Sequence, residues 1–170
     1  MIKQAVIIYG PPGSGKGTQA ELLVKNFDFI HFDTGRYLEN LFRDKKFIKD
    51  SRMKKEKLMW DSGILNSPDF VLDIVKKKTL QIDNSGESIV FSGSQRTIYE
   101  AIGSKKIKGL IHTLKELYGV NNIHIFKLVV PEKTSIYRNS KRMICSLCGL
   151  PILANSKLKN CSFCAAPARK

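Results

Sequence analysis

The sequence predicts an α/β fold in which a parallel β-sheet is flanked by helices and followed by a small C-terminal module. Short apolar runs rich in β-branched residues alternate with longer stretches of helical periodicity, as they do in βαβ units. All four cysteines lie between Cys145 and Cys164, in a segment without strong periodicity. A chain of 170 residues with 42% hydrophobic content is long enough for one domain with a buried core.

The predicted elements follow one another along the chain. The apolar runs predict strands over 2–9, 29–32, 88–91 and 123–130. Helices are expected over 18–26, 37–46, 51–60 and 68–80, and the last of these has a capping pattern at Ser67, Pro68 and Asp69. A final helix opens at Pro131–Glu132 and carries Arg138 and Arg142.

A glycine-rich loop separates the first strand from the first helix. Residues 10–16 read G-P-P-G-S-G-K and match the phosphate-loop pattern G-x-x-x-x-G-K in the strand–loop–helix context that the pattern requires. Glycines allow backbone N–H groups to turn toward phosphate oxygens, and the helix N-terminus favours negative charge. The sequence therefore predicts a P-loop NTPase-type sheet that holds a nucleoside triphosphate.

The residue after Lys16 is Gly17, with Thr18 next, where the general pattern has a hydroxyl residue directly after the lysine. The whole run 10–20 resembles the signature of adenylate kinases and related nucleoside-monophosphate kinases. Later segments resemble that family in the same order: 33–38, 61–65, 92–97, and the strand to Val130 followed by a helix with two arginines. The resemblance covers nearly the whole chain.

The resemblance implies Mg²⁺-dependent transfer of the γ-phosphoryl group of ATP to AMP or a related nucleoside monophosphate. Positioning and positive charge supply most of such catalysis, which suits lysine and arginine. The implied catalytic residues are Lys16, Arg96, Arg138 and Arg142. The implied ATP-binding residues are Gly10, Gly13, Ser14, Gly15, Lys16, Gly17 and Thr18. The implied monophosphate-binding residues are Thr34, Gly35, Arg36, Leu65, Gly93, Arg96 and Glu100.

Four positions depart from the family pattern. Ser92 and Arg36 stand where the family has acidic residues near the metal, and Asp33 is a candidate substitute. Glu39 replaces an arginine that binds the acceptor phosphate, and it also suits an i,i+4 pair with Arg43. Glu100 replaces the glutamine that reads the adenine. Its carboxylate accepts hydrogen bonds and could meet an amino group of adenine or cytosine.

The cysteines have the spacing C-x₂-C-x₁₂-C-x₂-C. Two such knuckles predict a closed structural Zn²⁺ site formed by Cys145, Cys148, Cys161 and Cys164, with free thiols or a redox pair as the alternative. Gly149 suits the tight turn after the first pair. Some bacterial adenylate kinases carry a similar zinc lid. The expected domains are a core over 1–142, with a monophosphate-binding segment at about 34–80, and a zinc lid over 143–170 that is incomplete at its C-terminal end.

The formal net charge of +14 favours anionic partners, although the lysine clusters also suit solvated helix faces. No run is long enough to cross a membrane, and the first apolar run is too short for a signal peptide. We expect a cytoplasmic monomer without a membrane or nucleic-acid partner. Two alternatives stay open: an inactive nucleotide-binding relative, and a zinc-ribbon nucleic-acid binder that uses Lys157 and Lys159. No chemistry is assigned to His31, His112 or His124.

Overall fold

The computed structural model describes residues 2–44, 50–152, 159–162 and 164–169. The chain divides into two compact units. The first comprises residues 1–9 and 17–127, and the second comprises residues 10–16 and 128–170. The glycine loop thus groups with the C-terminal segment, whereas the strand before it and most of the helix after it belong to the first unit. None of the described helices is long and apolar enough to span a membrane.

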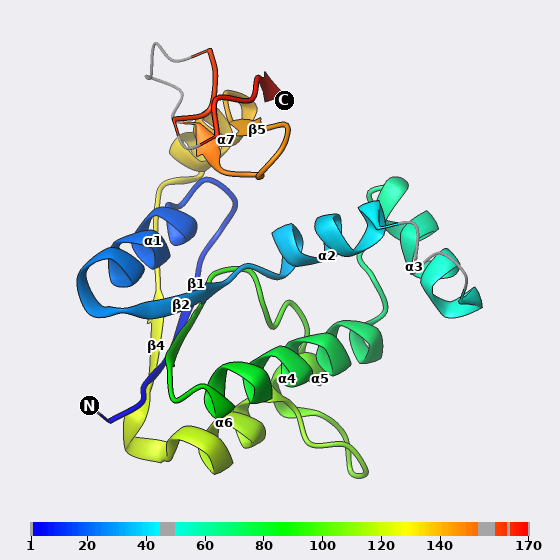
Figure 1. The fold of residues 1–170 in the computed structure, drawn as a ribbon, viewed down its shortest axis with the longest axis vertical. Coiled ribbons are helices and arrows are strands. Elements are labelled where there is room, and N and C mark those ends of the chain that lie inside the picture. The colour runs from blue at the N-terminus through cyan, green and yellow to red at the C-terminus, as the bar shows by residue number, and fades with distance from the viewer. Residues whose placement is uncertain (1, 45–49, 153–158, 163, 170) are drawn as a thin grey trace. The chain divides into compact units, whose positions relative to one another are not determined.

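The first unit contains a four-stranded parallel sheet, which confirms the predicted fold class (Figure 1). Its strands are β1 (Ala5–Tyr9), β2 (Phe29–Phe32), β3 (Ser88–Phe91) and β4 (Ile123–Lys127), in the order β2-β3-β1-β4. Ile7 pairs with Phe91 on one side and with Ile125 on the other. Strands β2 and β3 have the predicted bounds.

Helices connect these strands. They are α1 (Lys16–Phe27), α2 (Thr34–Arg43), α3 (Ser51–Asp61), α4 (Pro68–Asn84), α5 (Ile98–Ile102) and α6 (Leu110–Tyr118), and the short helix η2 (Val120–Asn122) precedes β4. Right-handed crossovers in this strand order put α4 and α6 on one face of the sheet and α1 on the other. Contacts between α4 and α6 agree with that arrangement (Figure 1).

The main core lies on the face that α4 and α6 cover. Strand residues whose side chains alternate toward that face, such as Ile7 and Phe91, are almost fully buried. Leu72 of α4 and Leu114 of α6 join them. The core thus fixes the carboxyl ends of three adjacent strands, which is where ligands bind in open parallel sheets.

Several predicted bounds need correction. Strand β1 begins at Ala5 rather than 2, and helix α4 ends at Asn84 rather than 80. Strand β4 ends at Lys127 rather than Val130, because its partner β1 ends at Tyr9, opposite Lys127. Helix α2 begins at Thr34 rather than 37, because the Asp33 carboxylate caps it by accepting a hydrogen bond from Arg36 N. The predicted end of this helix, at 46, lies outside the described residues. Helix α7 (Glu132–Ser140) contains Arg138, but Arg142 follows its end.

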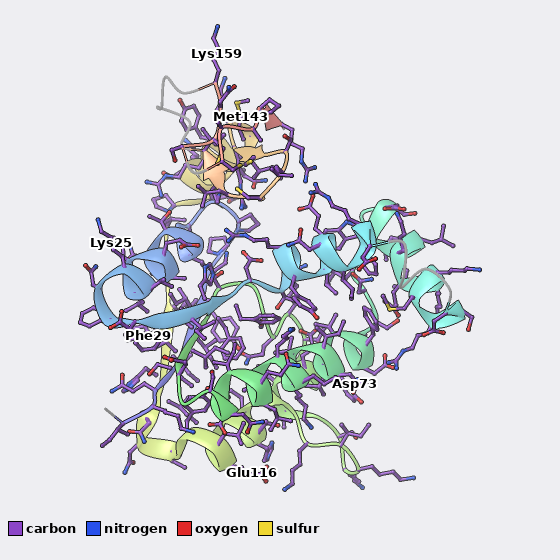
Figure 2. The ribbon with its side chains drawn as sticks, viewed as in Figure 1. Lys25, Phe29, Asp73, Glu116, Met143 and Lys159 are labelled. Carbon is purple, nitrogen blue, oxygen red and sulfur yellow. The ribbon has the colours of Figure 1, made fainter. Side chains whose placement is uncertain are left out.

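The second unit holds the glycine loop, α7 and a small antiparallel sheet. The strands of that sheet are β5 (Met143–Cys145), β6 (Pro151–Ile152) and β7 (Ala168–Arg169), in the order β6-β5-β7. Strand β5 pairs with both others, and Met143, labelled in Figure 2, begins it. The sequence did not predict these strands. Each has only two or three residues and therefore no readable alternation.

Candidate functional site

The glycine loop leaves β1 at Gly10 and leads into α1 at Lys16. Gly10, Gly13 and Gly15 all have positive φ angles, of 153°, 76° and 98°. A Cβ atom at Gly10 would lie 2.7 Å from Ser14 Oγ and 2.8 Å from Leu128 O, so this position excludes any side chain. The local sequence is therefore needed for the loop's turn, as the phosphate-loop prediction assumed.

The Lys16 side chain folds back over its own loop. Its Nζ atom donates hydrogen bonds to Gly10 O at 2.8 Å and to Pro11 O at 2.9 Å. Ser14 Oγ is buried and has no hydrogen-bond partner within the described ranges. A buried hydroxyl without a partner costs free energy unless a ligand supplies one, so the loop fits an oxygen-rich anion such as a polyphosphate.

Helix α7 packs against the same loop, within the second unit. Ser135 Oγ donates a hydrogen bond of 2.7 Å to Pro12 O. A Cβ atom at Gly13 would lie 3.0 Å from Ser135 O and 3.1 Å from Arg138 Cβ, so glycine permits this close approach. Arg138 Nη1 lies 3.5 Å from Gly13 O. Arg138 thus borders the loop, whereas Arg142 is exposed just before β5.

The segment after β3 meets the start of α2 within the first unit. Thr34 Oγ1 and Ser94 Oγ, both buried, are 2.6 Å apart. The Arg96 guanidinium donates to Gly93 O at 3.3 Å, and a Cβ atom at Gly35 would lie 3.8 Å from Arg96 Nη2. The structure therefore brings together four of the predicted monophosphate-binding residues: Thr34, Gly35, Gly93 and Arg96.

Glu100 is also a predicted substrate residue, and the structure shows what it contacts. The side chain is buried, and its carboxylate accepts hydrogen bonds from Arg96 N and Thr97 Oγ1, both at 3.0 Å. Thr97 Oγ1 in turn accepts from Glu100 N at 3.1 Å, so the threonine side chain caps the start of α5. These bonds orient the backbone that carries Arg96. Leu65 is 55% exposed between α3 and α4.

Gln95, in the same segment, has contacts that the sequence did not predict. It has a positive φ of 59°, and its Oε1 accepts a hydrogen bond from the Tyr9 hydroxyl. Burial and the negative charge of Glu100 raise the pKa of Tyr9, so its hydroxyl keeps the proton that it donates. Gln95 Nε2 is buried without a partner in the described part of the chain. The hydrogen bond between Gln95 and Tyr9 joins residues far apart in the sequence, so only the folded structure shows it.

The departures from the family pattern form two groups of contacts. Arg43 Nη2 donates to Glu39 Oε1 at 2.8 Å, which confirms the i,i+4 pair. Arg36 Nη2 lies 3.7 Å from Glu21 Oε1, and the same carboxylate oxygen is 2.9 Å from His31 Nδ1. His31 Nε2 is 2.6 Å from Ser92 Oγ. The histidine to which no chemistry was assigned is thus bonded to one of the substituted positions.

The four cysteines converge in the second unit. Their Sγ atoms lie within 4.8 Å of one another, with Cys145 and Cys164 at 3.4 Å and Cys148 and Cys161 at 3.7 Å. Ligand bonds of about 2.3 Å in a tetrahedron place sulfur atoms about 3.8 Å apart. The thiol cluster therefore fits Zn²⁺.

Each cysteine pair forms the same turn. Gly149 N donates to Cys145 O at 3.1 Å, and Ala165 N donates to Cys161 O at 3.0 Å. Gly149 and Ala165 both have positive φ, of 69° and 57°, which confirms the predicted tight turn at Gly149. Burial raises the pKa of the Cys145 thiol, but the N–H groups of Cys148 and Leu147 outweigh it and lower this pKa to about 6. The turn of the first pair thus favours the thiolate form of Cys145, which is the form that binds a metal.

Of the two lysines considered for nucleic-acid binding, Lys159 is exposed on this unit (Figure 2), and Lys157 lies outside the described residues.

The chain is similar to known proteins over most of its length. A family model described as the AAA domain matches residues 9–115, from the last residue of β1 into α6. The chain is 33% identical over 144 residues to the adenylate kinases of Caldicellulosiruptor saccharolyticus and Brevibacillus brevis. Each alignment covers 85% of this chain, and 61% and 62% of those relatives.

A third relative extends the match. The chain is 32% identical over 164 residues to the adenylate kinase of Desulforamulus reducens. This alignment covers 92% of this chain and 71% of that protein. The chain thus spans about three fifths of the length of the first two relatives and about seven tenths of the third.

Proposed function

Because the chain belongs to the adenylate kinase family, we propose that it is a nucleoside-monophosphate kinase that transfers the γ-phosphoryl group of ATP to AMP. The observation that carries the proposal is the glycine loop, where the Lys16 ammonium group lies over the carbonyls of Gly10 and Pro11. The buried, unpartnered hydroxyl of Ser14 lies in the same loop.

On the donor side, the loop's N–H groups and the start of α1 would bind the phosphates of ATP. Lys16 would exchange its two loop carbonyls for β- and γ-phosphate oxygens. Arg138 borders Gly13 and would stabilise charge that develops during transfer, and we propose the same role for the exposed Arg142.

Mg²⁺, when bound with ATP, neutralises charge on the β- and γ-phosphates. The ion takes oxygen ligands and keeps several of its waters, so hydroxyl and carboxylate groups suit it. Thr18 is exposed in the first turn of α1, and Ser92 follows β3. These two hydroxyl groups would contribute to its site. The carboxylate of Asp33 already accepts a hydrogen bond from Arg36 N, which supports a capping role for it.

On the acceptor side, Arg96 would bind the phosphate of AMP. The closeness of its guanidinium to Gly35 and the hydrogen bond to Gly93 O support this assignment, because they hold the planar fork at the start of α2. The zinc lid is proposed to cover the donor phosphates and exclude water, which strengthens electrostatic interactions in the site.

The test is diphosphate formation by the zinc-loaded chain with ATP, Mg²⁺ and each of AMP, CMP, UMP and GMP. We expect ADP from AMP, and a loss of about 10²- to 10³-fold in turnover for Lys16→Ala and for Arg96→Ala, the size seen when one preorganised charge-stabilising group is removed.

Matched controls are available among exposed basic residues of the first unit. Lys25→Ala removes an exposed lysine from the last turn of α1 (Figure 2), and Arg52→Ala removes an exposed arginine that pairs with Asp69. Both should keep normal turnover. ATP binding without turnover on any acceptor would contradict the proposal and favour a nucleotide-binding relative that does not transfer phosphate.

A further inference from the structure

A chain of hydrogen bonds links three elements of the first unit. Glu21 of α1 contacts His31 of β2, with Oε1 2.9 Å from Nδ1. His31 contacts Ser92, the residue directly after β3, with Nε2 2.6 Å from Oγ. The His31 side chain is 6% exposed and Ser92 is 4% exposed, so water does not compete strongly for the hydrogen bond between His31 and Ser92.

With the His31 ring neutral, which the first experiment below tests, the donors and acceptors present fix the proton positions. A carboxylate only accepts, so Nδ1 of His31 carries the proton that faces Glu21. In the neutral ring Nε2 then has a lone pair, which accepts the hydroxyl proton of Ser92. Ser92 Oγ has therefore used its one proton. Toward any further group it offers only lone pairs.

This restriction selects the kind of ligand that Ser92 can meet. Ser92 lies at the carboxyl end of β3, beside β1, whose last residue precedes the glycine loop. A phosphate oxygen is an acceptor and would find no proton at Oγ. A water molecule in the hydration shell of a cation is a strong donor, and Mg²⁺ retains several such waters. The hydroxyl thus suits the hydration shell and not the phosphate.

We propose that Glu21 and His31 are positioning residues that convert the Ser92 hydroxyl into an acceptor for Mg²⁺-bound water, in place of a carboxylate. The inference rests on the proposed function, because it assumes that ATP binds with Mg²⁺. A purely structural role for the three residues predicts a change in stability alone. The two roles are therefore separable by measurements of proton position and of metal coupling.

The first experiment measures the tautomer of His31 by long-range ¹H–¹⁵N NMR on the full, zinc-loaded chain. The chain has three histidines, so the His31→Gln variant assigns the signals. We expect a neutral ring protonated at Nδ1, with Nε2 showing the shift of a hydrogen-bond acceptor. A ring protonated at Nε2, or at both nitrogens at neutral pH, would overturn the proposal.

The second experiment measures by calorimetry how much Mg²⁺ tightens ATP binding, as the ratio of the dissociation constants without and with the metal. Magnesium is added to Mg²⁺-free buffer rather than removed by a chelator, so the zinc stays in place. Ser92→Ala should lower the ratio about three- to tenfold, the worth of one hydrogen bond, and leave metal-free ATP binding unchanged. An unchanged ratio would overturn the proposal.

Double variants separate positioning from folding. Glu21→Ala changes a side chain that is 41% exposed, and it should lower the ratio in the wild-type background but no further in Ser92→Ala. In Ser92→Asp, whose carboxylate accepts without help, Glu21→Ala should have no effect on the ratio. A loss there would contradict the positioning role. His112→Ala, an exposed histidine of α6, is the matched control.

The two proposals fail in different ways. Binding that responds to Ser92→Ala, without turnover on any monophosphate, would keep this inference and overturn the kinase. Normal turnover with an unchanged ratio in Ser92→Ala would overturn this inference and keep the kinase.

Discussion

The first unit, which contains the parallel sheet (the sheet unit), and the second unit, which contains the thiol cluster (the zinc unit), reach an ordered structure by different means. In the first, apolar residues of the strands and of α4 and α6 form a continuous buried cluster that includes Ile7, Phe91 and Leu114. In the second, the buried residues within the described ranges are few: Ser14, Ser135, Cys145, Ile152 and Cys161. Two of these are cysteines of the thiol cluster. The comparison indicates that apolar burial specifies the first unit, and it leads us to propose that a metal bound by the thiol cluster orders the second.

Removing the metal is expected to give the largest effect. A thiol-rich zinc site contributes roughly 10–16 kcal/mol of apparent binding free energy, which in such modules is folding free energy. We expect Cys148→Ser, or zinc withdrawal by a strong chelator, to abolish amide protection over 143–152, 159–162 and 164–169. Protection in β1, β3 and α6 should persist. Hydrogen exchange read by mass spectrometry checks both, and equal protection of the cysteine segment without zinc would contradict the comparison.

The same contrast explains how much the sequence predicted. Strands 29–32 and 88–91 were predicted with correct bounds, because polar residues border each short apolar run and mark where the strand begins and ends. The cysteine spacing predicted the thiol cluster, because each C-x₂-C pair forms its turn from residues that are neighbours in the sequence. Helices α5 and α6 received no prediction, because the segment that joins β3 to β4 was not resolved into separate elements.

Residues whose roles depend on distant partners escaped prediction. Ser135 contacts Pro12, 123 positions away, and His31 contacts Ser92, 61 positions away. Gln95 acquires its partner only because Tyr9 ends the adjacent strand. The glycine loop was read from local spacing, whereas these contacts follow from the order of strands in the sheet, which the element predictions alone did not fix.

Truncating the core should affect only the sheet unit. Leu114 of α6 is 0% exposed, so Leu114→Ala removes buried methyl groups and leaves a cavity. We expect a loss of about 2–5 kcal/mol in the free energy of unfolding. Urea unfolding measures this loss, with the exposed Leu58→Ala as control. Zinc affinity, measured by competition with a chromophoric chelator, should stay unchanged. A parallel fall in zinc affinity would show that the two units depend on each other.

A smaller effect should come from removing the charge of a buried carboxylate in the sheet unit, which hydrogen bonds from neighbouring groups stabilise. Glu56 is 1% exposed, and its Oε2 accepts from Asn66 Nδ2 and Ser67 N, both at 3.0 Å. Burial alone would raise its pKa, but the bonds from Ser67 and Asn66 outweigh burial and hold the pKa below its ordinary value of 4.5.

The sign of the pH effect follows from that direction. A lowered pKa in the folded state means that the carboxylate stabilises the protein above its ordinary pKa, and that this contribution is lost as the pH falls through the lowered value. Glu56→Gln replaces the charge and should cost about 1–3 kcal/mol at neutral pH. The difference from wild type should shrink toward acid pH in urea titrations. The exposed Glu87→Gln is the control, and a difference that is independent of pH would contradict the assigned cause.

The smallest expected effect compares the two cysteine knuckles with each other. Both turns need a residue with positive φ. Gly149 adopts this conformation without strain, whereas Ala165, at φ 57°, adopts it at a steric cost. The costs differ because Cβ crowds the backbone in the left-handed region, while glycine loses more chain entropy on folding. Ala165→Gly should therefore stabilise the second knuckle by up to about 1 kcal/mol, seen as a severalfold gain in zinc affinity. Gly149→Ala should lower that affinity by a similar factor. A fall in affinity for Ala165→Gly would mean that the methyl group contributes more by packing than it costs in backbone strain.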